Sequence, residues 1–453
     1  MKNLLRNPLL TIAALLLICS ARPCVAQVAR PITEFGATAD GATINTAFIQ
    51  KAIDTVAAGG GGTLVVPEGT FLTGSLFLKP SVNLHLNKNA VLKGTTDLKD
   101  YPLMETRVEG HFQQWVPALI NVDKCDNIRI DGEGTLDGSG PPFWQAFRSA
   151  IQQTRGTKNL DVPRPRLMFI RDSKNVTVSG IHFKDSGFWN LHLYRCQDVT
   201  IENLDIRAGE SSPSCDGMDI DSCQRVTIRG CHIFTNDDCI ALKGSKGVHA
   251  MEDKDSPPVE HIRVSDCTFE RGGSFVTCGS EATIVRDVVV ENCKAIGSSS
   301  GGMSMLRLKL RTDTPQSYSD MHFRNITLEG NGALIGIAPW TQYEDLQGQP
   351  RPAHTVSNIT MSNIKGAFGT FGSIRPNPGD TIEKIALENI DVKLTPPQGR
   401  GGFGGRRGTS GPATAPVAVA PTTGIARGAL PAFQGVTDVT FKNVIINGQP
   451  YNP

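Results

Sequence analysis

Three aspartates stand out in this sequence as candidate catalytic groups. Asp216 lies 21 residues before Asp237, and Asp238 follows directly. Carboxylates held close together repel one another, which raises the pKa of one of them and leaves an acid beside a base. Hydrolysis of a glycosidic bond needs that combination, because one carboxyl group protonates the leaving oxygen while another activates water. The alternative for Asp237 and Asp238 is an Asx turn that closes a loop.

Two cations and three aromatic residues could complete a site for a sugar. Arg307 and Lys309 are separated by one residue in a predicted strand, so their side chains point to one side and could bind the carboxylate of an anionic sugar. Trp340, Phe188 and Trp189 could each stack on the apolar face of a sugar ring. The alternatives are surface ion pairs for the cations and core packing for the aromatic residues.

A short repeated unit dominates the chain and must position these groups. A unit often starts with Asn or Asp and continues with apolar residues at alternate positions, which predicts a strand with one buried face. Units this short cannot bury their apolar face alone and must stack on their neighbours. The first apolar residues of successive units follow one another at steps of 23 to 38 residues: Val176, Val199, Val226, Ile262, Val288, Met321, Ile359 and Ile385.

The fold that meets both demands is all-β, a right-handed parallel β-helix. Adjacent coils of such a solenoid lie about 4.8 Å apart, so we expect Asp216 and Asp237 to meet on one face. A propeller is the alternative, but its blades need about 40 or more residues and four strands each. A leucine-rich horseshoe would need a Leu and Asn signature that this sequence lacks.

The cysteines fit the same solenoid. The chain has 11 of them, and Cys223, Cys231, Cys267 and Cys293 fall at apolar or turn positions of the repeat. A buried thiol packs as a small hydrophobe, so we expect mostly stacked interior thiols. No two cysteines have C-x-x-C spacing, which argues against a zinc site with four thiolate ligands.

The ends of the chain differ from the repeat. Residues 1–26 carry Lys2 and Arg6 before an uncharged run, which predicts a cleaved export signal too short to span a bilayer; a buried N-terminal helix is the alternative. Residues 27–453 are predicted to form one β-helix domain, with a short helix at 46–56 covering the N-terminal end of its core. Within that domain, residues 396–431 are rich in Gly, Pro, Ala and Arg, which predicts a disordered or loosely held loop.

Composition excludes several classes of protein. The 453 residues include 47 Gly and 28 Pro, too many for a helical bundle. The formal net charge is +1, and removing the predicted signal with Lys2, Arg6 and Arg22 would lower it to −2. Such a balance disfavours nucleic acid as a partner. We expect an exported monomer, periplasmic or secreted, with no membrane anchor.

Three ordered motifs complete the sequence evidence: Ser214-Cys215-Asp216, Asp237-Asp238-Cys239 and Arg307-Leu308-Lys309. They follow an N-terminal stretch that contains Phe35-Gly36-Ala37, Gly60 to Gly62 and Thr73-Gly74-Ser75-Leu76. Together they resemble the pectin-acting parallel β-helix enzymes and, more narrowly, glycoside hydrolase family 28, the polygalacturonases and their relatives. The resemblance covers about residues 31–446 and implies a pectin-lyase-like solenoid.

The resemblance also implies residue roles. Asp237 resembles the proton donor, and Asp216 with Asp238 resembles the pair that activates the attacking water. The family inverts configuration, which needs room for that water between acid and base. Arg307 and Lys309 resemble the residues that bind the galacturonate carboxylate, and no metal or other cofactor is implied.

Two departures from the family pattern bear on substrate. Ser274 stands where the family has its active-site histidine, which weakens an endo-polygalacturonase assignment and makes Ser274 a candidate substrate-binding residue. Residues 236–243 and 339–342, the latter including Trp340, are more similar to bacterial members that attack rhamnogalacturonan. We therefore rank removal of galacturonate from rhamnogalacturonan oligosaccharides first, and exo-polygalacturonase second.

Two other functions remain as alternatives. An inactive solenoid could bind an acidic polysaccharide, but keeping Asp216, Asp237 and Asp238 together would not help to bind an anion. A calcium-dependent lyase on the same fold would need an acidic calcium site and a basic residue to abstract a proton.

Overall fold

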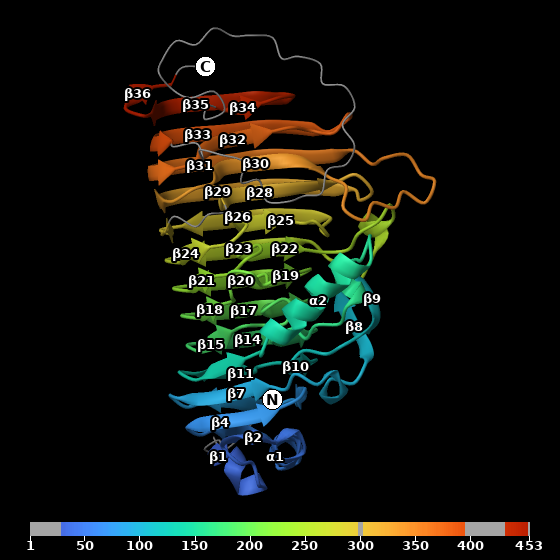
Figure 1. The fold of residues 1–453 in the computed structure, drawn as a ribbon. Coiled ribbons are helices and arrows are strands. Elements are labelled where there is room, and N and C mark those ends of the chain that lie inside the picture. Colours follow the sequence, from blue (N-terminus) through green and yellow to red (C-terminus); the bar gives the residue numbers. More distant parts are fainter. Residues whose placement is uncertain (1–28, 298–301, 395–430, 452–453) are drawn as a thin grey trace, which may run out of the picture.

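The computed structural model describes residues 29–297, 302–394 and 431–451, and they form a parallel β-helix (Figure 1). The strands of successive coils pair in parallel and build two long sheets, one of 23 strands and one of 11. The predicted all-β, right-handed solenoid is therefore confirmed. The predicted export signal and residues 396–430 of the predicted loop lie outside the described residues.

The 23-stranded sheet carries the repeat found in the sequence. Its apolar residues stack in register: Val176 pairs with Val199, and Val199 with Val226. Its strands are β1 Ala29–Pro31, β2 Asp40–Ile44, β3 Gly62–Val66, β4 Gly69–Thr73, β6 Val82–Leu86, β7 Ala90–Gly94, β11 Arg129–Gly132, β12 Thr135–Asp137, β14 Lys174–Ser179, β15 His182–Lys184, β17 Gln197–Glu202 and β18 Asp205–Arg207. They continue with β20 Gln224–Arg229, β21 His232–Phe234, β23 Val259–Ser265, β24 Thr268–Arg271, β26 Ile284–Glu291, β27 Lys294–Ala295, β29 Gln316–Glu329, β31 His354–Phe368, β33 Thr381–Leu394, β35 Val436–Ile446 and β36 Gln449–Pro450.

The Asn or Asp that often starts each unit has a backbone role. Asn175, Asp198, Asp287, Asp320 and Asn358 all have φ between 54° and 56°. This left-handed region is favoured for Asn and Asp among the residues that carry a side chain. The turn that starts a strand needs a residue with positive φ, which explains why many repeat units begin with Asn or Asp.

The 11-stranded sheet carries the predicted site residues Ser274, Arg307, Lys309 and Trp340, and the three predicted aspartates directly precede two of its strands. Its strands are β5 Leu76–Leu78, β10 Ile120–Asp123, β13 Met168–Arg171, β16 Leu191–Tyr194, β19 Met218–Asp221, β22 Ile240–Lys243, β25 Ser274–Cys278, β28 Ser304–Arg311, β30 Ala333–Trp340, β32 Thr370–Ile374 and β34 Ala432–Phe433. In β19 the side chains of Met218 and Ile220 belong to the core. Alternation along a strand then places Asp219 and Asp221 on the outer face.

Two α-helices cover parts of the solenoid. Helix α1, Thr46–Ala58, buries Ile49, Ala52, Ile53 and Val56 at the N-terminal end, as predicted for residues 46–56 (Figure 1). Helix α2, Pro141–Gln153, was not predicted; it buries Phe143, Trp144 and Phe147. The short 3-10 helices are η1 Ile32–Phe35, η2 Leu98–Asp100, η3 Asn159–Asp161 and η4 Ala250–Glu252. Among the helices of the described residues, none has the length and apolar character needed to cross a membrane.

An antiparallel hairpin stands apart from both sheets. Strands β8, Met104–Val108, and β9, His111–Trp115, pair only with each other. Figure 1 shows them beside α2, on the flank of the solenoid.

The cysteines of the described residues are buried free thiols, as expected. Neighbouring coils stack some of them; for example, the Cys196 backbone N–H donates to Cys223 Sγ at 3.2 Å.

Candidate active site

The outer face of the 11-stranded sheet carries a polar row across five coils. The register pairs His192 with Asp219, Asp219 with Ala241, Ala241 with Thr277, and Thr277 with Arg307. The next outward row includes Asp221 paired with Lys243. Ionisable groups from different coils are thus held side by side by backbone hydrogen bonds rather than by flexible loops.

The three predicted aspartates lie where the chain enters this sheet. Met218 pairs with Ile240, so Asp216 and Asp238 both precede paired residues by two positions. The Gly217 N–H also donates to the Asp238 carbonyl at 2.9 Å. The spacing in the sequence matched Asp216 with Asp237, whereas the register sets Asp216 beside Asp238, with Asp237 adjacent.

The carboxylate of Asp238 is held in place by polar and charged neighbours. Its side chain is fully buried, and Lys309 Nζ lies 2.6 Å from its Oδ2. The Ser274 hydroxyl donates to Oδ1 at 3.3 Å, and an Arg307 guanidinium nitrogen lies 4.0 Å from the same oxygen. Burial acts to raise the pKa of Asp238, but Lys309 and Arg307 outweigh it and hold that pKa well below its usual range.

Asp237 has the opposite character. Burial and then the charge of Asp238 raise its pKa, while Lys309 and Arg307 offset this only in part. The pKa values of two adjacent carboxyl groups are therefore shifted in opposite directions, down for Asp238 and up for Asp237. Environments that push neighbouring pKa values apart are what acid–base catalysis requires.

Asp216 belongs to a second buried group that the sequence did not reveal. Lys243 Nζ lies 3.5 Å from Asp216 Oδ2, 3.5 Å from Asp219 Oδ1 and 3.6 Å from Glu281 Oε2. Burial, Asp219 and Asp237 raise the pKa of Asp216 well above its usual range, and Lys243 opposes them. Burial raises the pKa of Asp219 to about 7.

A signal for this group does exist in the sequence. Asp219 continues the first motif, and Lys243 ends the strand Ile240–Lys243, at an alternate position that is otherwise apolar or small. Lys243 lies on β22, the strand that pairs with β19, where Asp219 lies and which Asp216 precedes. Its sequence position therefore offered it as a cationic partner for those two aspartates.

Trp340 lies with the two predicted cations. The Arg307 guanidinium carbon is 5.3 Å from the centroid of its indole ring, and Lys309 Nζ is 4.9 Å from that centroid. Lys309 is nearly buried against Asp238, whereas 36% of the Arg307 side chain is exposed. Arg307 is therefore the cation of this pair that can reach an incoming ligand.

The other two aromatic candidates are core residues. Phe188 and Trp189 are 0% and 3% exposed. Phe188 packs edge-on against Trp115 at 5.1 Å, and Lys243 Nζ lies 4.5 Å above the Trp189 ring. Neither leaves an open ring face for a sugar, so core packing describes both.

The β8–β9 hairpin covers the outer face of the sheet at the C-terminal ends of β19 and β22, where Arg107 contacts Asp221 and Ser245. Its Arg107 makes two hydrogen bonds to the carboxylate of Asp221, at 3.0 and 3.3 Å, with both side chains buried. Arg166 donates to the hydroxyl of Thr106 at 2.7 Å, and Phe112 contacts Tyr194 of β16. The hairpin is thus bound to coils β13, β16 and β19.

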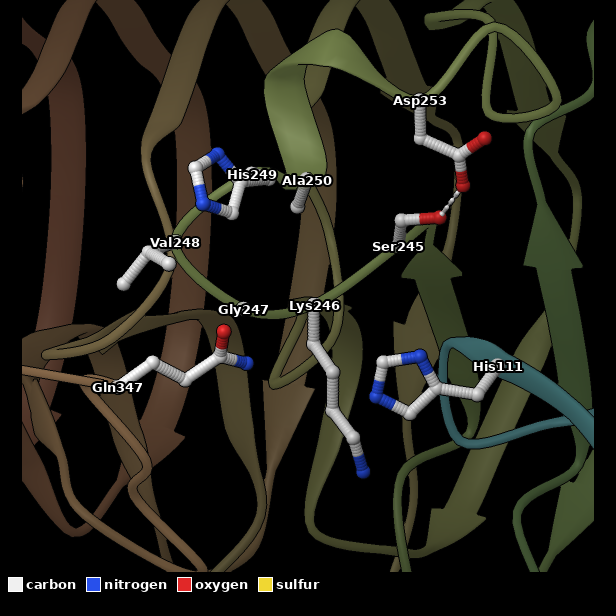
Figure 2. Close-up of a pocket in the computed structure, with 9 residues that line it drawn as sticks. All are labelled: His111, Ser245, Lys246, Gly247, Val248, His249, Ala250, Asp253 and Gln347. Carbon is white, nitrogen blue, oxygen red and sulfur yellow. Dashed lines mark hydrogen bonds between the residues drawn. The ribbon is translucent and has the colours of Figure 1, made fainter.

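A small pocket lies at the outer edge of this hairpin (Figure 2). Its volume is about 160 Å³, and its lining includes His111, Lys246 and Gln347. Figure 2 shows the Lys246 and His111 side chains lying close together. Lys246 Nζ is 3.8 Å from the buried Glu109 at the hairpin turn. The lining contains none of the predicted site residues.

No group of three or more His, Cys, Asp or Glu side chains within the described ranges is arranged to hold a metal ion. What the site offers is carboxyl groups of different pKa, a partly exposed guanidinium and an indole ring.

Comparisons with curated proteins find polygalacturonases among the relatives of this chain. A probable polygalacturonase of Vitis vinifera is 28% identical over 388 residues, which is 83% of this chain and 76% of that protein. An exopolygalacturonase of Zea mays is 28% identical over 377 residues, 79% of this chain and 83% of that protein.

Solved structures with the same fold include two exopolygalacturonases. The Thermotoga maritima structure has a TM-score of 0.68 at 24% identity and covers 81% of this chain and 87% of its own. The Yersinia enterocolitica structure has a TM-score of 0.70 at 19% identity and covers 94% and 79%. The family model described as glycosyl hydrolases family 28 matches residues 58–399. The chain therefore belongs to glycosyl hydrolases family 28, and it is a glycoside hydrolase.

Proposed function

We propose that this hydrolase removes galacturonate from the ends of pectic chains with inversion of configuration. The observation that carries the proposal is the contrast between Asp237 and Asp238, adjacent carboxyl groups whose pKa values are shifted in opposite directions. The exposed part of Arg307 lies beside them, 4.0 Å from Asp238. Relatives named polygalacturonase and exopolygalacturonase support pectin as the substrate class.

Asp237 is the proposed general acid. Its raised pKa keeps a proton available for the glycosidic oxygen as the bond breaks. Asp238, kept ionised by Lys309, and Asp216 would orient and deprotonate the water that attacks from the opposite side of the sugar. Attack from that side inverts the anomeric centre.

Arg307 is the proposed ligand of a galacturonate carboxylate. A guanidinium and a carboxylate can form two parallel hydrogen bonds, a geometry that a neutral sugar cannot offer. The Trp340 ring beneath Arg307 and Lys309 holds both cations on one side. Ser274 was a candidate substrate-binding residue, but its side chain is fully buried and its hydroxyl donates to Asp238, so its proposed part is to hold that carboxylate.

Cleavage at chain ends is proposed because of the β8–β9 hairpin. Its Arg107–Asp221 contact covers the outer face of the sheet at the C-terminal end of β19, the strand that Asp216 precedes. A polymer that crosses the site would have to displace this buried pair, whereas a chain end can enter from the side of Arg307. The pectic polymer also supports the predicted export, because such chains lie outside the cell.

Two substrates fit this proposal. The partly exposed Arg307 and the relatives named exopolygalacturonase favour galacturonate oligomers, in which the sugar beside the cleaved bond also carries a carboxylate. Rhamnogalacturonan oligosaccharides, which the sequence ranks first, stay a prediction based on residues 236–243 and 339–342.

Product analysis tests the proposal. The protein would be incubated in parallel with galacturonate oligomers and rhamnogalacturonan oligosaccharides, and the products would be sized over time. We expect free galacturonate from the first minutes, with new reducing ends and no ultraviolet absorbance from an unsaturated sugar. NMR of the first product should give the anomer opposite to the cleaved bond. Early release of mixed oligomers would contradict end cleavage, unsaturated products would indicate a lyase, and no product would indicate a binding protein.

A further inference from the structure

We propose that Lys243 is a positioning residue that stabilises the anionic form of Asp216 for its part in water activation. The inference rests on the proposed function and assigns a role to a residue that the three sequence motifs do not include. It starts from one geometric fact: Lys243 Nζ lies within 3.6 Å of an oxygen from each of Asp216, Asp219 and Glu281.

The position of Lys243 is fixed by the sheet. Its backbone belongs to β22 and pairs with Asp221 of β19. Its side chain is 6% exposed, with Nζ 4.5 Å above the Trp189 ring. Burying an ammonium group is unfavourable unless charges of opposite sign compensate. The carboxylates around Nζ supply that compensation, so the cation and the acidic group stabilise each other.

Other cations near the site have partners of their own. Lys309 pairs with Asp238 at 2.6 Å, and Arg311 pairs with Asp313 at 2.7 Å. Among the residues that the structure describes, Lys243 is the one cation within ion-pair distance of Asp216 or Asp219.

The ionisation of Asp216 depends on all the charges around it. Asp219 and Asp237 raise its pKa after burial has done so, Asp238 adds a smaller increase, and Lys243 acts in the opposite direction. The titratable and charged groups that surround it are Asp219 of β19, Asp237 and Asp238 before β22, Lys243 of β22, Glu281 after β25, Arg307 and Lys309 of β28, and the thiols of Cys215 and Cys239.

The direction of the effect on catalysis follows from this balance. Asp216 must be ionised to accept a proton from water, so its pKa sets the acid side of the pH–rate profile. A cation within about 4–6 Å lowers the pKa of a carboxyl group by about 1–3 units. Without the Lys243 charge the pKa of Asp216 rises, and activity is lost at a higher pH than in the wild type.

Substitution of Lys243 tests the inference on the full chain. We would measure kcat against pH at saturating galacturonate oligomer for Lys243→Met, Lys243→Arg and the wild type. Lys184→Met is the control, because Lys184 is half-exposed and pairs with Asp137 on the other sheet. The acid limb of Lys243→Met should move up by about one pH unit or more, with a smaller change in KM. Lys243→Arg should restore much of the wild-type profile, and the control should match it.

A second variant covers the case in which Lys243→Met fails to fold. Asp219→Asn removes the carboxyl group that competes for Lys243 and repels Asp216, so its acid limb should move to lower pH. An unmoved acid limb in folded Lys243→Met or in Asp219→Asn would overturn the assignment. The proposed function fails separately, when the wild type releases no galacturonate from any pectic oligosaccharide.

Discussion

Lys309 Nζ and Asp238 Oδ2 are 2.6 Å apart, and 9% of the lysine side chain and 1% of the aspartate side chain are exposed. This contact gives Asp238 a different role from its sequence neighbour. Asp238 is held as an anion, and that anion raises the pKa of Asp237. Lys309 acts to lower the pKa of both carboxyl groups, but only at Asp238 does this effect outweigh burial.

Replacing the proposed acid should abolish most turnover. Asp237→Asn keeps the shape of the side chain but removes its proton, so kcat should fall by about 10²–10⁴, the usual contribution of general acid catalysis. Steady-state kinetics on galacturonate oligomers would measure the loss, and a melting curve would confirm that the variant folds. Turnover equal to that of the wild type in a folded Asp237→Asn protein would remove Asp237 from this role.

The Lys309–Asp238 pair should make stability depend on pH. Because the pair lowers the folded-state pKa of Asp238, its contribution is fully present above the ordinary aspartate pKa of about 3.9 and is lost as pH falls through the lowered value. Lys309→Met leaves a buried carboxylate without its partner, which costs about 3–5 kcal/mol near neutral pH. The difference in Tm from the wild type should be largest near neutral pH and shrink below about pH 4. A Tm difference independent of pH would contradict this assignment of charge.

Arg307 should make the activity depend on the negative charge of the substrate. Arg307→Ala should lower kcat/KM on free-acid oligomers by about 1.5–3 kcal/mol, the worth of hydrogen bonds to a charged group and roughly 10- to 150-fold in rate. Methyl-esterified oligomers should show a much smaller loss. Arg324→Ala is a matched control, since Arg324 pairs with Glu291 on the other sheet. Equal losses on both substrates would mean that Arg307 does not bind the carboxylate.

The hairpin anchor should control which bonds are cleaved. Arg107→Met removes the partner of the buried Asp221, which costs about 3–5 kcal/mol of stability. It should also loosen β8–β9, so that oligomers longer than one sugar appear among early products. The double variant Arg107→Met with Asp221→Asn restores charge balance and separates the loss of the anchor from that of an unpaired charge. Monosaccharide alone from both folded variants would show that the hairpin does not set end cleavage.

The repeat could be predicted because the structure of each coil depends on residues that are close together in the sequence. Residues such as Asp198 and Asn358 adopt positive φ, and the apolar residues that follow them, Val199 and Ile359, face the core, so the pattern is visible in the sequence. Contacts between segments that are far apart in the sequence are harder to recognise from the sequence alone. Nothing near Arg107 indicates Asp221 as its partner, because their meeting depends on how the hairpin folds back over the sheet. Lys243 was missed for a related reason: its acidic partners lie on two coils other than its own, Asp216 and Asp219 on one and Glu281 on the other.

The order in which products leave follows from the closed side of the site. Under the proposed end cleavage, a sugar cut from a chain end would lie between the β8–β9 hairpin, anchored by Arg107 and Asp221, and the remaining chain. In that arrangement the shortened chain would have to dissociate before the monosaccharide leaves. Such an enzyme is distributive: it trims every chain in a mixture by a few units rather than degrading one chain processively to its end.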